Sequence, residues 1–318
     1  MNIGELKTLA DNIRAEVAKA IIGQEEIVDH LLIALFSSGH VLLEGPPGTA
    51  KTFLAQCFSE TLSLDFGRIQ FTPDLMPGDI VGSNLFNFQT STFTLTRGPI
   101  FCDLLLADEI NRTPPKTQAA MLEAMQERAV TIDGETHKLS SQFMVVATQN
   151  PIEQQGVYPL PEAQLDRFLF KLLIEYPDAE EEKKIVMQYG ERIGAPGPKD
   201  FGISAQVDEK TLIAAAEAVK SVKLVEDITD YIVRLIRATR ETADLENGAS
   251  PRAAIMLATA ARARAAISGR DYVVPDDVKA LAPSVLRHRT LLSPAAEIEG
   301  RRVDAIIEAL VERTEAPR

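Results

Sequence analysis

A short run of small residues between an apolar segment and a helical one limits this chain to few folds. The apolar segment HVLLEG, residues 40–45, predicts a strand, and residues 52–62 carry apolar side chains at helical spacing. Between them stands GPPGTAKT, residues 45–52. A strand, a glycine-containing loop and a helix form the context in which backbone N–H groups hold phosphate at a helix N-terminus. The order therefore predicts an α/β domain with a phosphate-binding loop.

The loop departs from the usual pattern at one position, because Ala50 stands where a glycine precedes the lysine. If φ is negative at this position, a single methyl group can be tolerated. Lys51 would reach the β- and γ-phosphates of a nucleotide, and the Thr52 hydroxyl would ligate Mg²⁺. The residues predicted to bind nucleotide here are consecutive: Gly45, Pro46, Pro47, Gly48, Thr49, Ala50, Lys51, Thr52 and Phe53.

Two acids close a second apolar strand, because the segment FCDLLLADE ends in Asp108 and Glu109. Buried acids are unfavourable unless they meet water, a metal or hydrogen-bond donors. We predict that Asp108 holds Mg²⁺ with Thr52, and that Glu109 orients and deprotonates an attacking water. Two acids that merely cap a strand are the alternative. Asn150 ends the next strand, where its amide could bond that water and the γ-phosphate while also forming an Asn-Pro turn.

Further apolar segments, residues 66–72, 143–150 and 168–177, complete the predicted sheet. Continuous apolar strands that alternate with helices favour a parallel sheet covered on both faces. After Pro177 the chain becomes almost entirely helical in pattern. We therefore predict an α/β nucleotide-binding core over residues 1–177 and a smaller all-α domain over residues 178–318.

Two segments interrupt this pattern with alternating apolar and polar residues, which predicts hairpins. The first spans about residues 85–95. The second spans about residues 129–139 and contains Asp133-Gly134, a dipeptide typical of a type I′ turn. Both could be local decorations of the sheet edge.

The composition of the chain argues against several classes of function. The formal net charge of −13 argues against nucleic acid as the main partner, because binding to phosphate backbones relies on clustered lysine and arginine. No apolar run approaches the length of a membrane span, and the first residues do not resemble a secretion signal. The two cysteines, Cys57 and Cys102, are expected to be reduced core residues, which fits a cytoplasmic protein.

In combination these segments resemble the AAA+ ATPases. Residue by residue, they are most similar to the MoxR family among them. The resemblance runs from about residue 21 to residue 288. It rests on IGQEE at 22–26, LLEGPPGTAKT at 42–52, RIQFTPDLMPGDIVG at 68–82, GPIFCDLLLADEINRTPPKTQAAMLEAMQE at 98–127, ATQNPIEQQGVYPLPEAQLDRF at 147–168, GASPRA at 248–253 and GRDYVVPDDV at 269–278. Ala50 resembles that family's own form of the loop. The resemblance implies an AAA+ P-loop αβα domain with a parallel five-stranded sheet, followed by an all-α lid.

The resemblance also implies roles for single residues. Asp108 and Glu109 look like the Walker B pair and Asn150 like sensor 1. Arg252 looks like sensor 2, an arginine that the lid directs toward the γ-phosphate; Ser250 as N-cap and Pro251 at the first helical position would make it project from a helix start. Three residues would line the adenine pocket, Ile22, Gly23 and Gln24.

Arg167 stands where the family has an arginine finger, which completes the site of a neighbouring subunit. An ion pair of Arg167 with Asp166 or Glu162 is the alternative. Arg112 is a second candidate for the subunit interface. The two hairpins resemble a helix-2 insert and the hairpin before sensor 1, and Phe86, Phe88 and Phe93 could be contact residues.

For function, the resemblance implies a ring ATPase, most simply a homo-hexamer, that uses ATP/ADP and Mg²⁺. Its expected output is chaperone-like remodelling or maturation of protein complexes, including metal cofactor insertion, with a client protein and a von Willebrand factor A domain partner. Three alternatives stay open: a nucleic-acid motor or loader, a small-molecule phosphotransferase, and a nucleotide-gated scaffold with little turnover.

Overall fold

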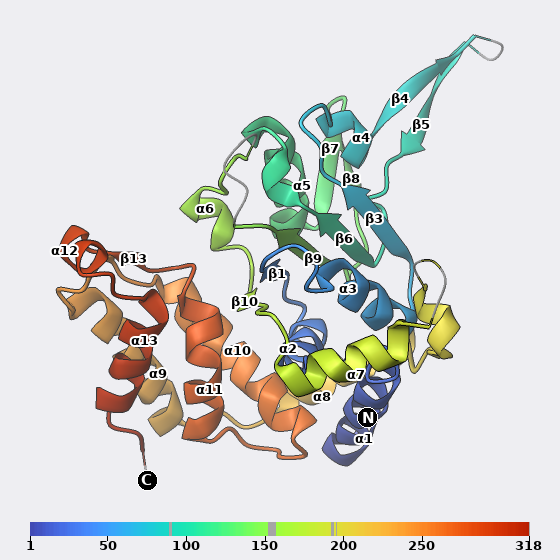
Figure 1. Ribbon diagram of the computed structural model, residues 1–318. Helices are drawn as coiled ribbons and strands as arrows, with labels where there is room; N and C mark the ends of the chain where they lie inside the picture. Colours follow the sequence, from blue (N-terminus) through green and yellow to red (C-terminus); the bar gives the residue numbers. More distant parts are fainter. Residues whose placement is uncertain (89–90, 152–156, 192–193, 195, 318) are drawn as a thin grey trace.

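A five-stranded parallel sheet organises the first half of the chain in the computed structural model, which describes residues 1–88, 91–151, 157–191, 194 and 196–317. The strand order is β10-β1-β9-β6-β3, so β9 lies between β1 and β6 (Figure 1). The strands are β1 Val41–Glu44, β3 Phe66–Gln70, β6 Leu104–Asp108, β9 Met144–Gln149 and β10 Phe170–Leu173. This confirms the predicted parallel α/β fold.

Each face of the sheet packs into its own apolar core. Along β6, Leu104 and Leu106 join one core, and Leu105 and Ala107 join the other, as the two-residue period of a strand requires. The first core contains side chains of three N-terminal helices, α1 Ile3–Val17, α2 Glu25–Phe36 and α3 Lys51–Glu60. The second contains side chains of α4 Pro77–Val81 and α5 Pro115–Glu127. The fully buried strands therefore read as continuous apolar runs because both faces are covered.

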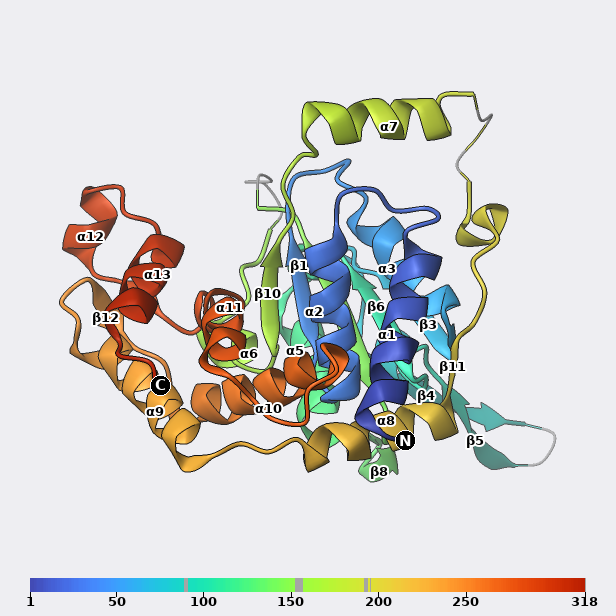
Figure 2. The same cartoon turned by 90° about the horizontal axis from the view of Figure 1, so that it is seen from below.

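The remainder of the chain is mostly helical. α9 buries an apolar stripe on one face, which includes Ile228, Tyr231 and Leu235. Figures 1 and 2 both show α9, α11, α12 and α13 grouped to one side of the sheet. The helices are α6 Glu162–Leu165, α7 Ala179–Tyr189, α8 Glu209–Ser221, α9 Glu226–Glu241, α10 Pro251–Ile267, α11 Pro275–Leu286, α12 Pro294–Ile298 and α13 Val303–Arg313, with 3₁₀ turns η1 Ile110–Arg112 and η2 Pro198–Phe201. The division near residue 178 stays a prediction.

Short strands complete the fold. β2 Leu62–Ser63 pairs with β11 Val207–Asp208, and β12 Leu245–Asn247 with β13 Leu291–Leu292. The first predicted hairpin consists of β4 Gly82–Asn87 and β5 Thr92–Arg97, and it points away from the rest of the molecule (Figure 1). Residues 89–90 of its tip lie outside the described residues. The second consists of β7 Ala129–Ile132 and β8 Glu135–Lys138, and both turn residues have positive φ, as a type I′ turn requires.

A buried histidine ties the end of α5 to the sheet. The Nε2–H of His40 donates to the Met125 carbonyl at 3.1 Å, and its Nδ1 accepts from the Val145 N–H at 3.0 Å. Burial lowers the pKa of His40 to about 4. Both ring nitrogens are used by the neutral form, so protonation would cost the bond from Val145. His40 is therefore a structural residue.

This arrangement predicts a pH-dependent contribution to stability. The unfolded chain binds a proton at His40 below a pH of about 6.5, whereas the folded chain does so only near 4, so stability falls as the pH drops through this window. The difference in unfolding free energy between the wild type and His40→Gln should shrink by about 2 kcal/mol between pH 7 and pH 5. Urea titrations at both pH values measure it. A difference that does not change with pH would contradict this role.

Candidate functional site

The phosphate-binding loop joins β1 to α3 and is closed by contacts that come from elsewhere in the chain. The Gln24 Nε2 donates to the Thr49 carbonyl at 3.2 Å, and the Thr49 hydroxyl donates to the Pro46 carbonyl at 2.9 Å. Gly48 has a φ of +83°. The loop is thus fixed from two sides.

The sequence argument tolerated Ala50 on the assumption that its φ is negative, and that assumption is wrong. Ala50 has a φ of 59°, in the left-handed region, where it forms the N-cap of α3. A non-glycine residue costs about 1–2 kcal/mol in that conformation, which the rest of the loop must offset. The carbonyl of Ala50 nevertheless accepts the first helical bond from Leu54 at 2.8 Å. The alanine is therefore tolerated with backbone strain, as often occurs at functional sites.

Lys51 provides the positive charge of the loop. Its Nζ donates to the carbonyls of Gly45 at 2.8 Å and Pro46 at 2.7 Å. Partial burial lowers the pKa of Lys51, and the charges of Asp108 and Glu109 oppose that shift. The ammonium group is thus held inside the loop, at the place where the predicted phosphates would lie.

Asp108 is buried at the end of β6 and is surrounded by donors. Its Oδ1 accepts from the hydroxyls of Thr52 at 2.9 Å and Thr148 at 2.7 Å, and its Oδ2 accepts from Arg68 Nη2 at 2.9 Å. The carboxylate and the Thr52 hydroxyl are hard oxygen donors of the kind that Mg²⁺ prefers. The pair that the sequence predicts for the metal is therefore brought into contact, and its chemistry fits the ion.

Glu109 follows directly and turns in another direction, since its φ of 58° is also left-handed. Its N–H donates to the Thr148 hydroxyl at 2.9 Å. Its Oε2 accepts from Gln70 Nε2 at 2.7 Å and pairs with Arg112 Nε at 3.2 Å. Side chains from β3 and η1 thus aim this carboxylate.

Asn150 follows β9, the strand between the loop-bearing β1 and the acid-bearing β6. It is buried, and its carbonyl accepts from Asn111 Nδ2 at 3.2 Å. The register pairs Glu44 with Gln149, so Asn150 lies at the level of Gly45, whose N–H donates to the Gln149 carbonyl. The structure therefore brings Asn150 to the same sheet edge as the loop and the acids.

A cavity of about 840 Å³ opens beside the loop, which is within the range of small-molecule sites. Gly23 has a φ of +75°, a conformation that favours glycine, and the Glu181 carboxylate of α7 lies against it. The Oε1 of Gln24 is buried without a partner among the described residues. Predicted nucleotide-binding residues from both segments line this cavity: Ile22, Gly23, Gln24, Gly48, Thr49, Ala50 and Phe53. A nucleobase fits this cavity.

The far wall of the cavity comes from the segment after β10 and from α7. Tyr189 at the end of α7 packs on Phe201 and Phe53, with ring centroids 5.2 and 6.4 Å apart, and its hydroxyl donates to the Ala20 carbonyl. Glu181 and Ile185 of the same helix also line the cavity. The cavity therefore lies between the core and α7.

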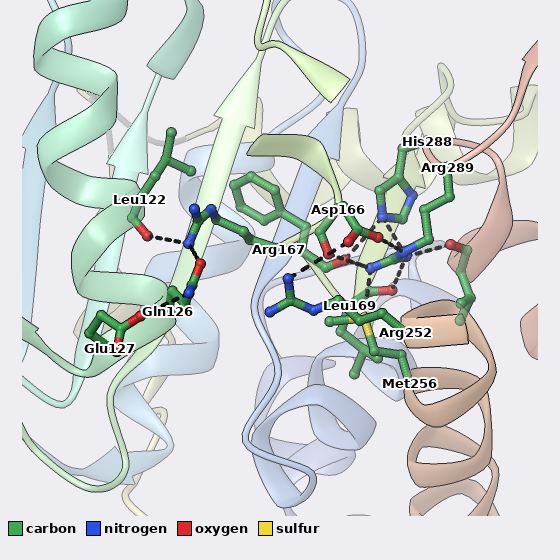
Figure 3. A network of polar contacts seen from close by, with 12 residues as sticks. Leu122, Gln126, Glu127, Asp166, Arg167, Leu169, Arg252, Met256, His288 and Arg289 are labelled. Atoms are coloured by element: carbon green, nitrogen blue, oxygen red, sulfur yellow. Dashed lines mark hydrogen bonds and ion pairs between the residues drawn. The ribbon is translucent and has the colours of Figure 1, made fainter. Parts of the chain in front are cut away.

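The two other predicted arginines lie at the junction of α5, α6 and the C-terminal helices (Figure 3). Arg167 Nη1 donates to the Leu122 carbonyl at 3.2 Å and to Gln126 Oε1. Arg252 pairs with Asp166 at 3.7 Å. Ser250 is at the N-cap position of α10, but its side chain makes no capping bond there, while Pro251 does begin the helix. Of the described residues that line the cavity, none is Arg167 or Arg252.

Several residues of this site escaped the sequence reasoning. Arg68 and Gln70 are two positions apart in β3, so their side chains lie on the same face of the sheet. β3 pairs with β6, and Gln70 stands opposite Asp108. That two-residue period was the available signal. Thr148 gave the same signal, two positions before Asn150. Arg289 gave none, because nothing near it in sequence marks it as buried.

Comparison with known proteins agrees with this geometry. The model of the ATPase family associated with various cellular activities (AAA) matches residues 40–170, and the AAA lid domain matches residues 237–310. The chain is 43% identical to the protein named Chaperone MoxR1 of Mycobacterium tuberculosis, over 95% of this chain and 81% of that protein. The chain belongs to the MoxR family of AAA+ ATPases.

Two further proteins match nearly the whole of this chain. YeaC of Bacillus subtilis, a protein without an assigned function, is 41% identical over 98% of this chain and 96% of its own length. The crystal structure of a candidate ATPase from Cytophaga hutchinsonii has a TM-score of 0.89 and 38% identity, covering 99% of this chain and 97% of that one. Within the described part of the chain, no helix is both long and apolar enough to span a bilayer.

The position of Lys51 predicts the effect of removing it. Lys51→Ala should weaken ATP binding by about 10- to 100-fold or more, because a hydrogen bond to a charged group contributes about 1.5–3 kcal/mol. Titration with a fluorescent ATP analogue measures this. Lys199→Ala is the control, since that lysine is exposed. Unchanged affinity in Lys51→Ala would refute the assignment of the loop.

Proposed function

We propose that this MoxR-family protein hydrolyses ATP to ADP and phosphate and uses the reaction to remodel protein complexes. The observation that carries the proposal is the meeting of Lys51, Asp108, Glu109 and Asn150 at one sheet edge, beside a cavity of nucleotide size. These residues reach it from the ends of different strands. Such a set favours transfer of the γ-phosphoryl group to water.

The chain's own residues divide the work. The loop N–H groups and Lys51 would hold the β- and γ-phosphates, and the Thr52 hydroxyl and Asp108 would hold Mg²⁺. When bound, Mg²⁺ would supply positive charge that offsets the negative charge of the phosphates. The contact of Thr52 with Asp108 at 2.9 Å supports this assignment.

Glu109 would take the proton of the attacking water. The water oxygen bonds to the γ-phosphorus as the bond to the β-phosphate oxygen breaks, which gives ADP and phosphate. Asn150 would orient the water, and Gln70 and Arg112 would hold the carboxylate of Glu109 in line. Arg252 would stabilise charge on the γ-phosphate.

Arg167 is proposed to act on a neighbouring subunit. It contacts α5 and is not among the described residues that line the cavity of its own chain. Arg112, the other candidate, is engaged with Glu109 of the same chain, which favours Arg167 for the trans role. A site completed across an interface implies a ring of copies, and we propose a homo-hexamer.

The proposed output is work on a protein client. A relative that is 43% identical is named as a chaperone. The β4–β5 hairpin offers an exposed apolar cluster in which the ring of Phe86 packs on those of Phe88 and Phe93, each with centroids 5.1 Å apart; Phe88 is 87% exposed. An apolar cluster on a projecting hairpin fits a contact with protein. In more detail, we propose that the remodelling includes insertion of a metal cofactor. We also propose that the protein acts with a partner that carries a von Willebrand factor A domain.

The proposed chemistry predicts the behaviour of Glu109→Gln. This variant should still bind ATP but release phosphate about 10²- to 10⁴-fold more slowly, because the amide cannot accept the proton. Single-turnover phosphate release measures the effect. Glu217→Gln, at an exposed position, should hydrolyse normally. Normal release by Glu109→Gln would remove this residue from the mechanism.

A shared site predicts complementation between two inactive variants. In an equal mixture of Arg167→Ala and Lys51→Ala subunits, about a quarter of the sites should combine an intact loop with a neighbour's Arg167, if mixing in the ring is random. The ATPase rate of the mixture should therefore exceed that of either variant alone. A mixture as inactive as its components would place Arg167 outside the neighbour's site.

A further inference from the structure

Asp166 and Arg167 are consecutive residues whose side chains point in opposite directions (Figure 3). Arg167 contacts α5, through Leu122 and Gln126. Asp166 instead faces Arg252 and Arg289, both within the segment that matches the AAA lid domain. The segment before β10 therefore joins the predicted trans-acting arginine to the lid.

The ion pair of Arg289 with Asp166 is the more strongly held of the two contacts between the lid and Asp166. Its side chain is only 1% exposed, and its Nε donates to Asp166 Oδ1 at 2.8 Å. Its Nη2 donates to the Asp166 carbonyl at 2.9 Å, and its other donors reach the carbonyls of Phe168, Leu169 and Val285. Burial lowers the pKa of Arg289 to about 10, against the effect of Asp166. Among the described residues Asp166 supplies its only ion pair, and breaking a buried pair leaves an uncompensated charge.

The ion pair of Arg252 with Asp166 is the weaker contact. It reaches the other oxygen of the same carboxylate, Asp166 Oδ2, at the longer distance of 3.7 Å, and its side chain is 46% exposed. An exposed ion pair at this distance contributes little to stability. Arg252 can therefore leave Asp166 for a phosphate while Arg289 keeps its hold on the same side chain.

We propose that Asp166 is a positioning residue that couples the lid to Arg167. This inference rests on the proposed function, in which Arg252 senses the γ-phosphate and Arg167 completes a neighbour's site. When the lid moves with nucleotide, the Arg289–Asp166 pair carries the adjacent Arg167 with it. The position of the lid thereby sets how well a subunit supplies Arg167 to the next.

A double-mutant cycle tests the coupling. Asp166→Asn should lower kcat for ATP hydrolysis by about 10- to 100-fold, because small misplacements of a catalytic group have effects of that size. Its affinity for a fluorescent ATP analogue should stay within about twofold of wild type, since the nucleotide's own loop is untouched. In an Arg167→Ala background, Asp166→Asn should slow hydrolysis no further, because it acts through the residue already removed.

A matched control separates coupling from loss of stability. The pair of Arg287 and Asp304 is also in the lid, at 3.0 Å, and both of its side chains are mostly buried. Asp304→Asn should lower the Tm but leave kcat unchanged. If Asp166→Asn does not fold, Arg289→Lys serves instead, since it keeps the charge but loses the planar fork that reaches several carbonyls. It should show the same non-additive loss with Arg167→Ala.

The outcomes distinguish this inference from the proposed function. Losses that multiply in the double variant, or a wild-type kcat in Asp166→Asn, would overturn the coupling while the ATPase itself stands. The same holds if Arg167→Ala hydrolyses ATP at the wild-type rate. A wild-type protein that does not hydrolyse ATP would overturn the proposed function and the coupling that rests on it.

Discussion

The position of β9 between β1 and β6 is the constraint on which the rest of the site depends. All three strands run in the same direction, so their carboxyl ends, and the loop, acids and amide that follow them, meet at one edge. The Thr148 hydroxyl joins the end of β9 to both Asp108 and Glu109. A change of register by one residue would turn every one of these side chains to the wrong face.

The charges at this edge are already matched within the protein. Arg68 faces Asp108, Arg112 faces Glu109, and the carbonyls of the loop surround the ammonium of Lys51. A triphosphate with its metal would exchange some of these contacts for new ones. Until then the contacts hold the charged side chains in fixed positions, which is the preorganisation that electrostatic catalysis needs.

The sequence was sufficient for the sheet, both hairpins and the strand-end acids, because each has a local pattern of apolar period or turn residues. It failed at Ala50, whose φ depends on how the whole loop closes, including a bond from Gln24 far upstream. It also missed the pairing of Asp166 with Arg289, which lie 123 positions apart. Contacts of this kind follow from tertiary packing, and no period along the chain reports them. The roles of the individual site residues remain predictions.

The position of α7 over the cavity bears on how fast a spent nucleotide could depart. The contact of Tyr189 with Phe53 joins the end of this helix to α3, the helix that follows the phosphate-binding loop, and the contact with Phe201 joins it to η2. A base bound beside α7 would pass side chains of this helix as it leaves. How readily this single helix undocks would then bear on the rate of nucleotide exchange.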